Sequence, residues 1–324
     1  MSQVTEKPPE KFVFALLGAF SLIAFSSAIE PLRIANRISG TTLYSWRLAA
    51  QNRETVTCSN GTTLRVDMGF EEVGRNETIL VCGGISIKSA TTPEVLAWLR
   101  RQSRKGMTIG GLCTASYVLA KAGMLDNRRA TIHWENRESF IEDFPEHIIA
   151  TSVFIMDKNR FTSAGGTASL DLMLKIIANA HGIDLANAVA DQMIYTSVRT
   201  DKDDQRLSIP TRIGVPHPKL STVIKMMEAN LEEPISPATL AGDVKISTRQ
   251  LERLFRRYLD RSPKCYYMEL RLQKARNLLL QTEMSVINVA LACGFTSPSH
   301  FSKCYRLHFS TTPYRERGAQ KDTP

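Results

Sequence analysis

Residues 251–263 read LERLFRRYLDRSP, and residues 301–313 read FSKCYRLHFSTTP. The second stretch repeats the pattern of the first at a spacing of fifty residues. The repeated positions are Leu251 and Phe301, Arg253 and Lys303, Phe255 and Tyr305, and Pro263 and Pro313. A repeat of this kind indicates one supersecondary unit used twice, and the pattern is typical of a helix-turn-helix. Two basic helices in tandem suit two successive major grooves of DNA.

The first copy predicts a helix over Thr248–Leu259, with Ser247 as its N-cap. Apolar residues at i, i+3, i+4 and i+7 form a stripe that we expect to be buried, namely Leu251, Leu254, Phe255 and Tyr258. The side chains off that stripe are Arg249, Gln250, Glu252, Arg253, Arg256 and Arg257. A helix face that is merely soluble usually mixes glutamate with lysine, whereas arginine pairs with guanine edges and phosphates. This composition therefore predicts a DNA-reading helix.

The second copy predicts a scaffold helix over Val286–Cys293, a turn at Gly294 and Phe295, and a second reading helix over Pro298–Phe309. The candidate outward residues of that helix are Ser299, His300, Ser302, Lys303 and Arg306. A long helix over Pro263–Gln281 is expected between the two units. At about 1.5 Å per residue it spans about 28 Å, close to one turn of DNA.

Residues 218–318 resemble the AraC/XylS family of bacterial transcription regulators. The matching positions are Arg271, Ala275, Ala290, Gly294, Phe295, Ser297, His300, Phe301, Ser302, Lys303, Phe309, Pro313, Tyr314 and Arg315. The resemblance implies base contacts by Arg249, Glu252 and Arg253 in the first helix, and by Pro298, Ser299, Ser302 and Lys303 in the second. Because Pro298 has no backbone N–H to donate, we expect less base readout and more phosphate anchoring from the second helix. The family's usual glycine after the aromatic residue is Ser310 in this chain.

Charge is distributed unevenly along the chain. Residues 217–324 carry 17 of the 41 lysines and arginines but only 10 of the 32 acidic residues, so most of the net charge of +9 lies in the last third. This asymmetry is typical of a nucleic-acid-binding module on a near-neutral domain, although a solvated basic face has the same composition. The length of 324 residues predicts two or three domains. The six cysteines show no C-x-x-C pairing, which predicts a reduced protein without a metal site or cofactor.

An apolar run over residues 12–25 follows Lys7 and Lys11 and is similar to a signal peptide. A buried strand over Phe12–Leu17, a turn and an amphipathic helix over Leu22–Asn36 explain the same run without export. The run is also shorter than the roughly 20 residues that a membrane span needs. We therefore expect a cytoplasmic protein with no membrane partner.

Strand-like and helix-like runs alternate over residues 1–198. The candidate strands are Phe12–Leu17, Trp46–Gln51, Thr78–Cys82, Thr108–Gly110, Arg129–Ile132 and Val153–Asp157, and the candidate helices are Leu22–Asn36, Glu94–Lys105, Thr114–Ala122, Trp134–Phe144, Ala168–His181 and Gly182–Tyr195. Such alternation predicts an α/β domain with a doubly wound, flavodoxin-like parallel sheet. Charge and proline without apolar periodicity predict a linker over residues 199–217, followed by an all-α tandem helix-turn-helix domain over residues 218–318.

A candidate site follows one of these strands. Gly110-Gly111-Leu112-Cys113-Thr114 has the strand-turn-helix layout that places a nucleophile at a helix N-terminus, where the helix dipole favours a thiolate. His133 follows the next strand, and cysteine with histidine permits nucleophilic catalysis. The alternative is structural: Cys113 is a small buried residue in a tight turn, and His133 a partly buried histidine with satisfied hydrogen bonds.

These residues resemble the PfpI-type branch of the class I glutamine amidotransferase superfamily, and the whole chain resembles the GlxA group of AraC-type regulators. The matches are Glu30-Pro31-Leu32-Arg33, Ala35-Asn36, Gly83-Gly84, Cys113-Thr114, Leu119-Ala120, Ala122-Gly123, Leu125, Thr131, His133-Trp134 and Asp171. Enzymatic members carry an acidic residue just after the first strand, whereas this chain has Gly18-Ala19-Phe20-Ser21 there. We therefore expect a degenerate Cys113–His133 pair without enzymatic activity.

The reused pocket is expected to bind a small effector through Glu30, Gly83, Gly84, Cys113, Thr114, His133 and Trp134. Effectors in this group are often amino acids or quaternary amines; Glu30 and Trp134 suit a cation, and glycine N–H groups suit a carboxylate. The expected function is a transcription activator whose partners are promoter DNA, the effector, RNA polymerase and a second copy of the chain.

Two other functions remain open at this point. One is a cysteine-dependent hydrolase or glyoxalase-like enzyme with an accessory DNA-binding module. The other is a constitutive DNA-binding protein whose α/β domain serves only dimerisation.

Overall fold

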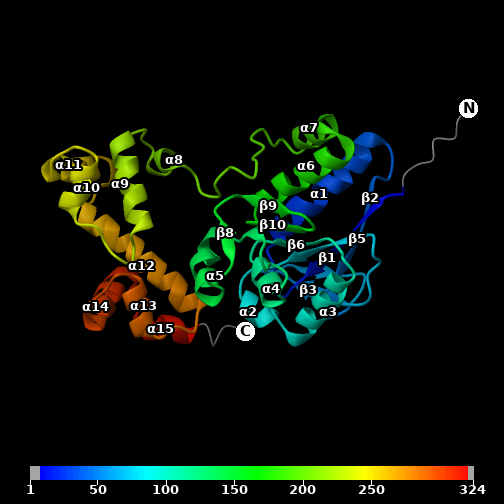
Figure 1. The fold of residues 1–324 in the computed structure, drawn as a ribbon, viewed down its shortest axis with the longest axis horizontal. Coiled ribbons are helices and arrows are strands. Elements are labelled where there is room, and N and C mark those ends of the chain that lie inside the picture. The colour runs from blue at the N-terminus through cyan, green and yellow to red at the C-terminus, as the bar shows by residue number, and fades with distance from the viewer. Residues whose placement is uncertain (1–7, 320–324) are drawn as a thin grey trace, which may run out of the picture. The chain divides into compact units, whose positions relative to one another are not determined.

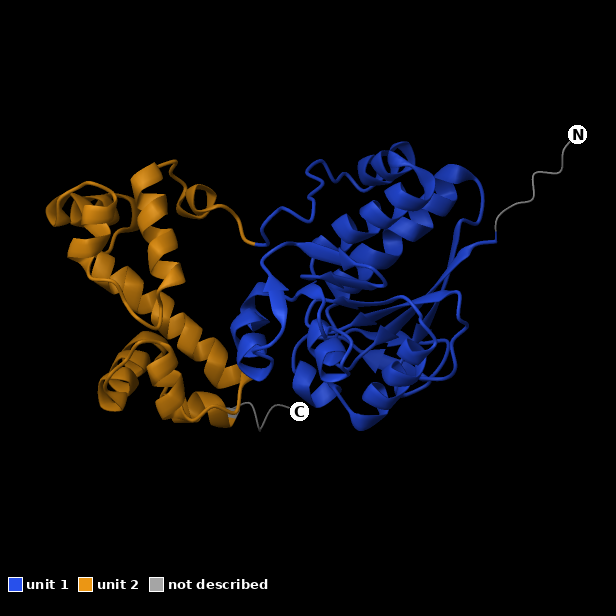
Figure 2. Ribbon diagram, in the orientation of Figure 1, with its two compact units in different colours: residues 1–205 blue, residues 206–324 orange. Residues whose placement is uncertain are grey.

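The computed structural model describes residues 8–319 of the chain. The chain divides into two compact units, and the boundary lies between Gln205 and Arg206 (Figure 2). The first unit has apolar clusters on both faces of a sheet, and the second has two clusters among helices. Each unit therefore has its own core.

A six-stranded sheet lies at the centre of the first unit (Figure 1). Its order is β2-β1-β5-β6-β10-β9, and the strands are β1 (Glu10–Leu16), β2 (Tyr44–Ala49), β5 (Glu77–Cys82), β6 (Ile109–Leu112), β9 (Phe154–Asp157) and β10 (Arg160–Ser163). All neighbouring pairs are parallel except β9 with β10. The expected parallel sheet is thus present, with one antiparallel edge strand.

Helices cover both faces of this sheet because each strand buries side chains on both sides. Phe12, Phe14 and Leu16 of β1 pack in one cluster with the helices α1 (Leu22–Ser39), α6 (Ala168–His181) and α7 (Ile183–Gln192). Val13 and Ala15 pack in the other with the helices α3 (Pro93–Arg104), α4 (Ser116–Lys121) and α5 (Arg137–Asp143). This arrangement confirms the doubly wound α/β class.

Some elements differ from the sequence prediction. The expected strand over Arg129–Ile132 lies outside the central sheet, because β7 (Arg129–Thr131) pairs with β8 (Ile148–Ala150) in a separate two-stranded sheet. The strand β10 was not predicted, because three of its four residues are polar; Arg160 is nevertheless buried and donates to the carbonyl oxygen of Met107 at 3.0 Å. Short elements complete the unit: the hairpin strands β3 (Thr55–Thr57) and β4 (Thr63–Arg65), the helix α2 (Ile87–Ala90) and a 3-10 turn over Trp134–Asn136.

The apolar run near the start of the chain forms β1 and the first turns of α1. Ser21 caps α1, with its hydroxyl oxygen accepting from the backbone N–H of Ala24 at 3.4 Å. Within residues 8–319, no helix combines the length and the apolar character needed to cross a membrane.

The second unit is helical throughout its described part (Figure 1). Its helices are α8 (Ile209–Ile213), α9 (Pro218–Ala229), α10 (Pro237–Asp243), α11 (Thr248–Leu259), α12 (Pro263–Gln281), α13 (Val286–Ala292), α14 (Pro298–Phe309) and α15 (Pro313–Ala319). One core lies among α8 to α12, and a second among α12 to α15. The long helix α12 supplies Tyr267 to the first core and Leu278 to the second, so it joins the two units of the repeat.

The segment predicted as a linker, residues 199–217, is packed rather than extended. Residues up to Gln205 hydrogen-bond to the first unit. Beyond Arg206, Ile209 is buried in the core of the second unit and α8 forms a short helix. The charged and proline-rich sequence did not predict these contacts. The groups that bind residues 199–205 to the first unit are polar, and the segment has no periodic apolar side chains.

Candidate effector site and DNA-binding helices

The candidate effector site lies where the strand order reverses. From β1 the chain continues to β2 on one side of it, whereas β5 and β6 extend the sheet on the other side. Ligands of open α/β sheets bind at the carboxyl ends of the strands at such a point. The loops after these strands meet there: the N–H of Ser21 donates to the carbonyl oxygen of Gly83 at 2.9 Å, and that of Cys113 to the carbonyl oxygen of Ser163 at 2.9 Å.

Cys113 has the left-handed backbone conformation of a nucleophile elbow. Its φ is 63°, although it is not glycine, and only 8% of its surface is exposed. Gly165 makes the conformation possible, because a Cβ there would lie 2.9 Å from the Cys113 sulfur, and its own φ is 85°. Residues held in such strained geometry cluster at functional sites.

The surroundings of the Cys113 thiol disfavour its thiolate form. Burial raises its pKa to about 11, against weaker opposing hydrogen bonds from the Thr114 backbone and the Ser21 hydroxyl, and the Glu135 carboxylate raises it further. Burial thus opposes the thiolate that a strand-turn-helix layout favours, in keeping with the expected degenerate pair. The reason is geometric, because the thiol is buried and α4 begins only at Ser116 and spans six residues.

His133 and Trp134 lie beside Cys113 in the turn after β7. The backbone N–H of His133 donates to the carbonyl oxygen of Cys113 at 3.3 Å, and the His133 and Trp134 rings lie 5.8 Å apart. Burial lowers the pKa of His133, partly opposed by Glu135, whose carboxylate lies 3.9 Å from Nδ1. Trp134 is 39% exposed. An imidazole with a lowered pKa, a partly exposed indole and a carboxylate thus lie close together in the turn beside Cys113.

The structure brings together six of the seven residues expected to bind the effector. Thr114 Oγ1 donates to the carbonyl oxygen of Gly84 at 2.8 Å, which joins the turn after β5 to the Cys113 turn. Glu30 is not part of this group. It lies on α1 nine residues after Ser21, and its carboxylate is exposed and accepts from Arg33 at 2.6 Å.

Two residues of the site were not predicted from the sequence. Ser21 stands where an acidic residue was sought, and Glu135 supplies the nearby negative charge. Glu135 could have been found from the sequence, because it lies two residues after His133 in the same turn. Ser21 lies far from Cys113 in the sequence, and only the sheet topology brings the two together. The glycines at 165 and 166 were expected either to present backbone N–H groups to a ligand or to form a tight turn, and Gly165 packs against the Cys113 thiol.

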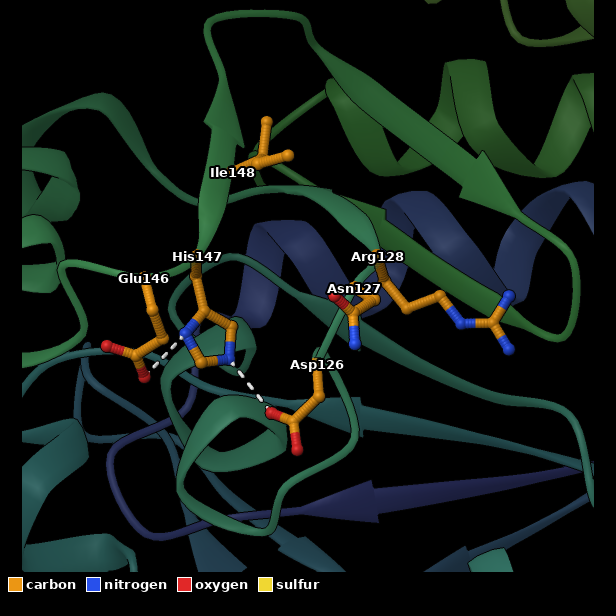
Figure 3. Close-up of a pocket in the computed structure, with 6 residues that line it drawn as sticks. All are labelled: Asp126, Asn127, Arg128, Glu146, His147 and Ile148. Atoms are coloured by element: carbon orange, nitrogen blue, oxygen red, sulfur yellow. Dashed lines mark ion pairs between the residues drawn. The ribbon is translucent and has the colours of Figure 1, made fainter.

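Three described cavities lie elsewhere in the first unit. One of about 330 Å³ is lined by Asp126, Asn127, Arg128, Glu146, His147 and Ile148 (Figure 3). In it the His147 ring lies between the carboxylates of Asp126 and Glu146, at 3.4 and 3.0 Å (Figure 3). A second, of about 240 Å³, lies between α6, α7 and residues 198–201. A third, of about 300 Å³, opens near Glu10 and Asn179.

We expect Cys113 to react slowly with alkylating reagents. A pKa of about 11 leaves a far smaller thiolate fraction at pH 7.5 than an ordinary cysteine has, so iodoacetamide should modify Cys113 at least about a hundredfold more slowly than in the urea-unfolded chain. Peptide mass spectrometry measures the rate at this residue, with the exposed Cys265 as an internal control. Equal rates in the folded and unfolded chains would reveal an activated thiol and favour an enzyme.

In the second unit, α11 has the predicted orientation. Leu251 and Phe255 are fully buried, Leu254 and Tyr258 partly buried, and all six candidate reading residues exposed. Ser247 caps the helix in a capping box, in which the Gln250 side-chain oxygen accepts from the Ser247 N–H at 2.8 Å. Gln250 thus has a structural role that was not predicted.

The second reading helix, α14, is anchored by Phe301 and Tyr305, which are fully buried. Pro298, Ser299, His300, Lys303 and Arg306 are exposed, and Ser302 is partly buried. The turn before α14 is held by Arg271 of α12, which donates to the carbonyl oxygens of Cys293 at 2.7 Å and Gly294 at 2.6 Å. The Arg271 guanidinium also lies 4.2 Å from the centre of the Phe295 ring. This arginine therefore fixes where α14 begins.

The two reading helices also end alike, in left-handed residues fifty positions apart. Asp260 has a φ of 53° and Ser310 a φ of 57°. Because glycine adopts this conformation without a steric penalty, we expect Ser310→Gly to raise the free energy of unfolding of the second unit by about 0.5–1 kcal/mol. Urea titration measures the change, and a loss of stability would contradict the argument.

Comparisons with known proteins agree with both parts of the chain. Residues 240–319 match the helix-turn-helix domain model, and residues 19–179 match the DJ-1/PfpI family model. The transcriptional regulator GbdR of Pseudomonas aeruginosa is 44% identical over 96% of this chain and 85% of its own length. The transcriptional regulator GlxA of Rhizobium meliloti is 38% identical over 94% of each chain.

A solved AraC family transcriptional regulator from Pseudomonas putida shares 27% identity with a TM-score of 0.50, covering 57% of this chain and all of that one. The fold, the tandem reading helices and these similarities agree. The chain belongs to the AraC-type helix-turn-helix transcription regulators of the GlxA group, in which a DJ-1/PfpI domain precedes the DNA-binding domain.

Proposed function

We propose that this regulator changes its DNA binding in response to a small metabolite held beside Cys113. The observation that carries the proposal is the convergence of the Gly83-Gly84 turn, Cys113, Thr114, His133 and Trp134 at the point where the strand order reverses. Open α/β sheets bind their ligands at such points.

The chemistry of the site supports binding rather than catalysis. A cysteine nucleophile needs a thiolate and an orienting partner, whereas Cys113 is a buried thiol with a pKa of about 11. Ser21 stands in the loop after β1 and supplies a hydroxyl rather than a carboxylate. We therefore infer that the chain is not an enzyme.

The site favours an effector with a cationic group, such as an amino acid or a quaternary amine. Trp134 is 39% exposed, and Glu135 keeps 48% of its side chain exposed, with its carboxylate 3.9 Å from His133 Nδ1. An aromatic face and a carboxylate together attract an organic cation. Glu135 takes the place that the sequence analysis gave to Glu30.

For the second unit we propose promoter DNA as the partner, read by α11 and α14. Arg249, Arg253, Arg256 and Arg257 form the exposed basic face of α11, and Lys303 and Arg306 that of α14. We further propose that the chain acts in the cytoplasm as a homodimeric activator that contacts RNA polymerase, as an AraC-type regulator would.

A thermal-shift panel of amino acids, quaternary amines and carboxylates tests the effector. A ligand at a hundred times its Kd stabilises the folded state by about 2.7 kcal/mol, which raises Tm by roughly 5 °C or more. Glu135→Gln should abolish the shift for cations, and the exposed Glu142→Gln serves as the matched control. A panel without any shift would favour a domain that serves only dimerisation.

A further inference from the structure

We infer that residues 199–205 transmit effector occupancy to the DNA-binding unit, because they hydrogen-bond to the segment just before His133 and to the segment just after Gly165, which packs against Cys113. The inference rests on the proposed function, since it needs the Cys113 site to be the effector site. It assigns the transmitting role to two side chains, Arg199 and Gln205.

Arg199 fastens the start of this segment. Its backbone N–H and Nε donate to the Asp171 carboxylate at 2.8 and 2.9 Å, and the Asp171 side chain is fully buried. Its Nη2 donates to Thr167 Oγ1 at 2.8 Å. Thr167 lies two residues after Gly165, whose backbone packs against Cys113. A shift of the Gly165 loop therefore moves a hydrogen-bond partner of Arg199.

Gln205 fastens the end of the segment to the other loop. Its side-chain N–H groups donate to the carbonyl oxygen of Ile132 at 2.9 Å, to Thr131 Oγ1 at 2.9 Å and toward the carbonyl oxygen of Ser152 at 3.2 Å. Ile132 directly precedes His133. The Gln205 side chain thus hydrogen-bonds to the residue next to His133 of the effector site.

The segment between these anchors lies along residues 151–153, just before β9. The Val153 N–H donates to the carbonyl oxygen of Asp203 at 2.9 Å, and the Gln205 N–H donates to that of Thr151 at 3.2 Å. An isolated bridge pairs Ser152 with Asp204. These hydrogen bonds hold the segment against the first unit.

Arg206, the residue after Gln205, is held by the second unit. Arg206 pairs with Glu228 of α9 at 3.5 Å, and Arg212 of α8 pairs with the same glutamate at 2.9 Å. Gln205 therefore hydrogen-bonds to the first unit, and the adjacent Arg206 forms an ion pair within the second. Any change in how Gln205 is held reaches the second unit through one peptide bond.

The attachment of Gln205 is also incomplete. Its side-chain oxygen is buried and accepts no hydrogen bond within the described residues. A buried acceptor without a donor destabilises the arrangement that contains it. Small movements of the Ile132 loop can therefore change the balance between an attached and a released segment, which is what a two-state switch requires.

Hydrogen exchange of the full-length chain tests the inference without any ligand. Gln205→Ala should speed amide exchange in peptides covering residues 129–134 and 151–153 by roughly five- to tenfold, because the bonds that hold both strands are lost. Gln205→Glu keeps the size but places a carboxylate against two carbonyl oxygens, so it should act in the same direction. Gln192→Ala, at an exposed glutamine, is the control. Unchanged exchange in both Gln205 variants overturns the inference.

A second readout separates transmission from mere local structure. With glycine betaine as the probe and a duplex selected by the wild-type protein, the Gln205 variants should bind the probe within about twofold of wild type. The probe-induced change in DNA affinity should be lost in both. Retention of that change in the variants overturns the inference. If wild type does not bind glycine betaine, the failure belongs to the proposed effector class, and the exchange comparison alone decides on Gln205.

Discussion

Asp171→Ala should lower the free energy of unfolding of the first unit by about 3 kcal/mol. The Asp171 carboxylate is fully buried and accepts from the Tyr195 hydroxyl at 2.9 Å as well as from Arg199. Its removal leaves the Arg199 guanidinium, which is 27% exposed, without its ion-pair partner. Partial exposure of the arginine places the expected loss at the low end of the range for buried pairs.

Urea unfolding of the full-length chain, followed by a signal from the first unit, measures this loss. Asp191→Ala provides the control, because that aspartate is exposed at the end of α7 and its backbone oxygen alone makes a described contact. A loss below about 1 kcal/mol for Asp171→Ala would mean that the ion pair is no more stabilising than a surface pair.

Gly294→Ala should have an effect of similar size in the second unit, of about 3 kcal/mol. Gly294 has a φ of 72°, and a Cβ there would lie 2.7 Å from the carbonyl oxygen of Glu232 and 2.8 Å from that of Leu231. These are backbone atoms, which cannot move aside as a flexible side chain does. The substitution therefore strains the turn that leads into α14 and separates it from the loop after α9.

The expected result for Gly294→Ala is a lower unfolding midpoint together with weaker DNA binding, because α14 loses its fixed orientation. Gly242→Ala is the matched control, and it should raise the free energy of unfolding rather than lower it. Gly242 lies within α10, and a Cβ there would meet no atom within 4 Å. Alanine is more favourable than glycine in a helix by up to about 1 kcal/mol. Equal stability changes in the two variants would show that the turn geometry has no special role.

Much of the fold was predictable because its signals are local. The stripe of Leu251, Leu254, Phe255 and Tyr258 predicts both the helix α11 and the face it buries, and the structure has that face inward. The apolar run Ile79–Cys82 predicts a strand buried on both sides, and all four residues are fully buried. The periodicity of apolar residues is enough to predict an element and its buried face where both depend on residues close together in the sequence.

The remaining features depend on contacts between distant segments. Nothing local marks Arg160 as a buried strand residue, because its guanidinium donates to Met107 and Ser103, which lie more than fifty residues away in the sequence. The effector site has the same character: the pKa of Cys113 follows from burial and from Glu135, neither of which the elbow motif reveals. Residues 199–205 likewise look like a linker until their partners at Asp171 and Ile132 are known.

Selection of duplexes from a random library by the full-length protein, followed by titration of Arg253→Ala, tests the central claim that the chain reads DNA with two unequal helices. We predict that Arg253→Ala weakens binding to the selected duplex by about 1–3 kcal/mol and relaxes specificity at one base position, with little change on a scrambled duplex. Lys303→Ala, in α14, should weaken binding to both duplexes about equally, as a phosphate contact does. Equal losses on both duplexes for Arg253→Ala, or no selected sequence at all, would contradict this account.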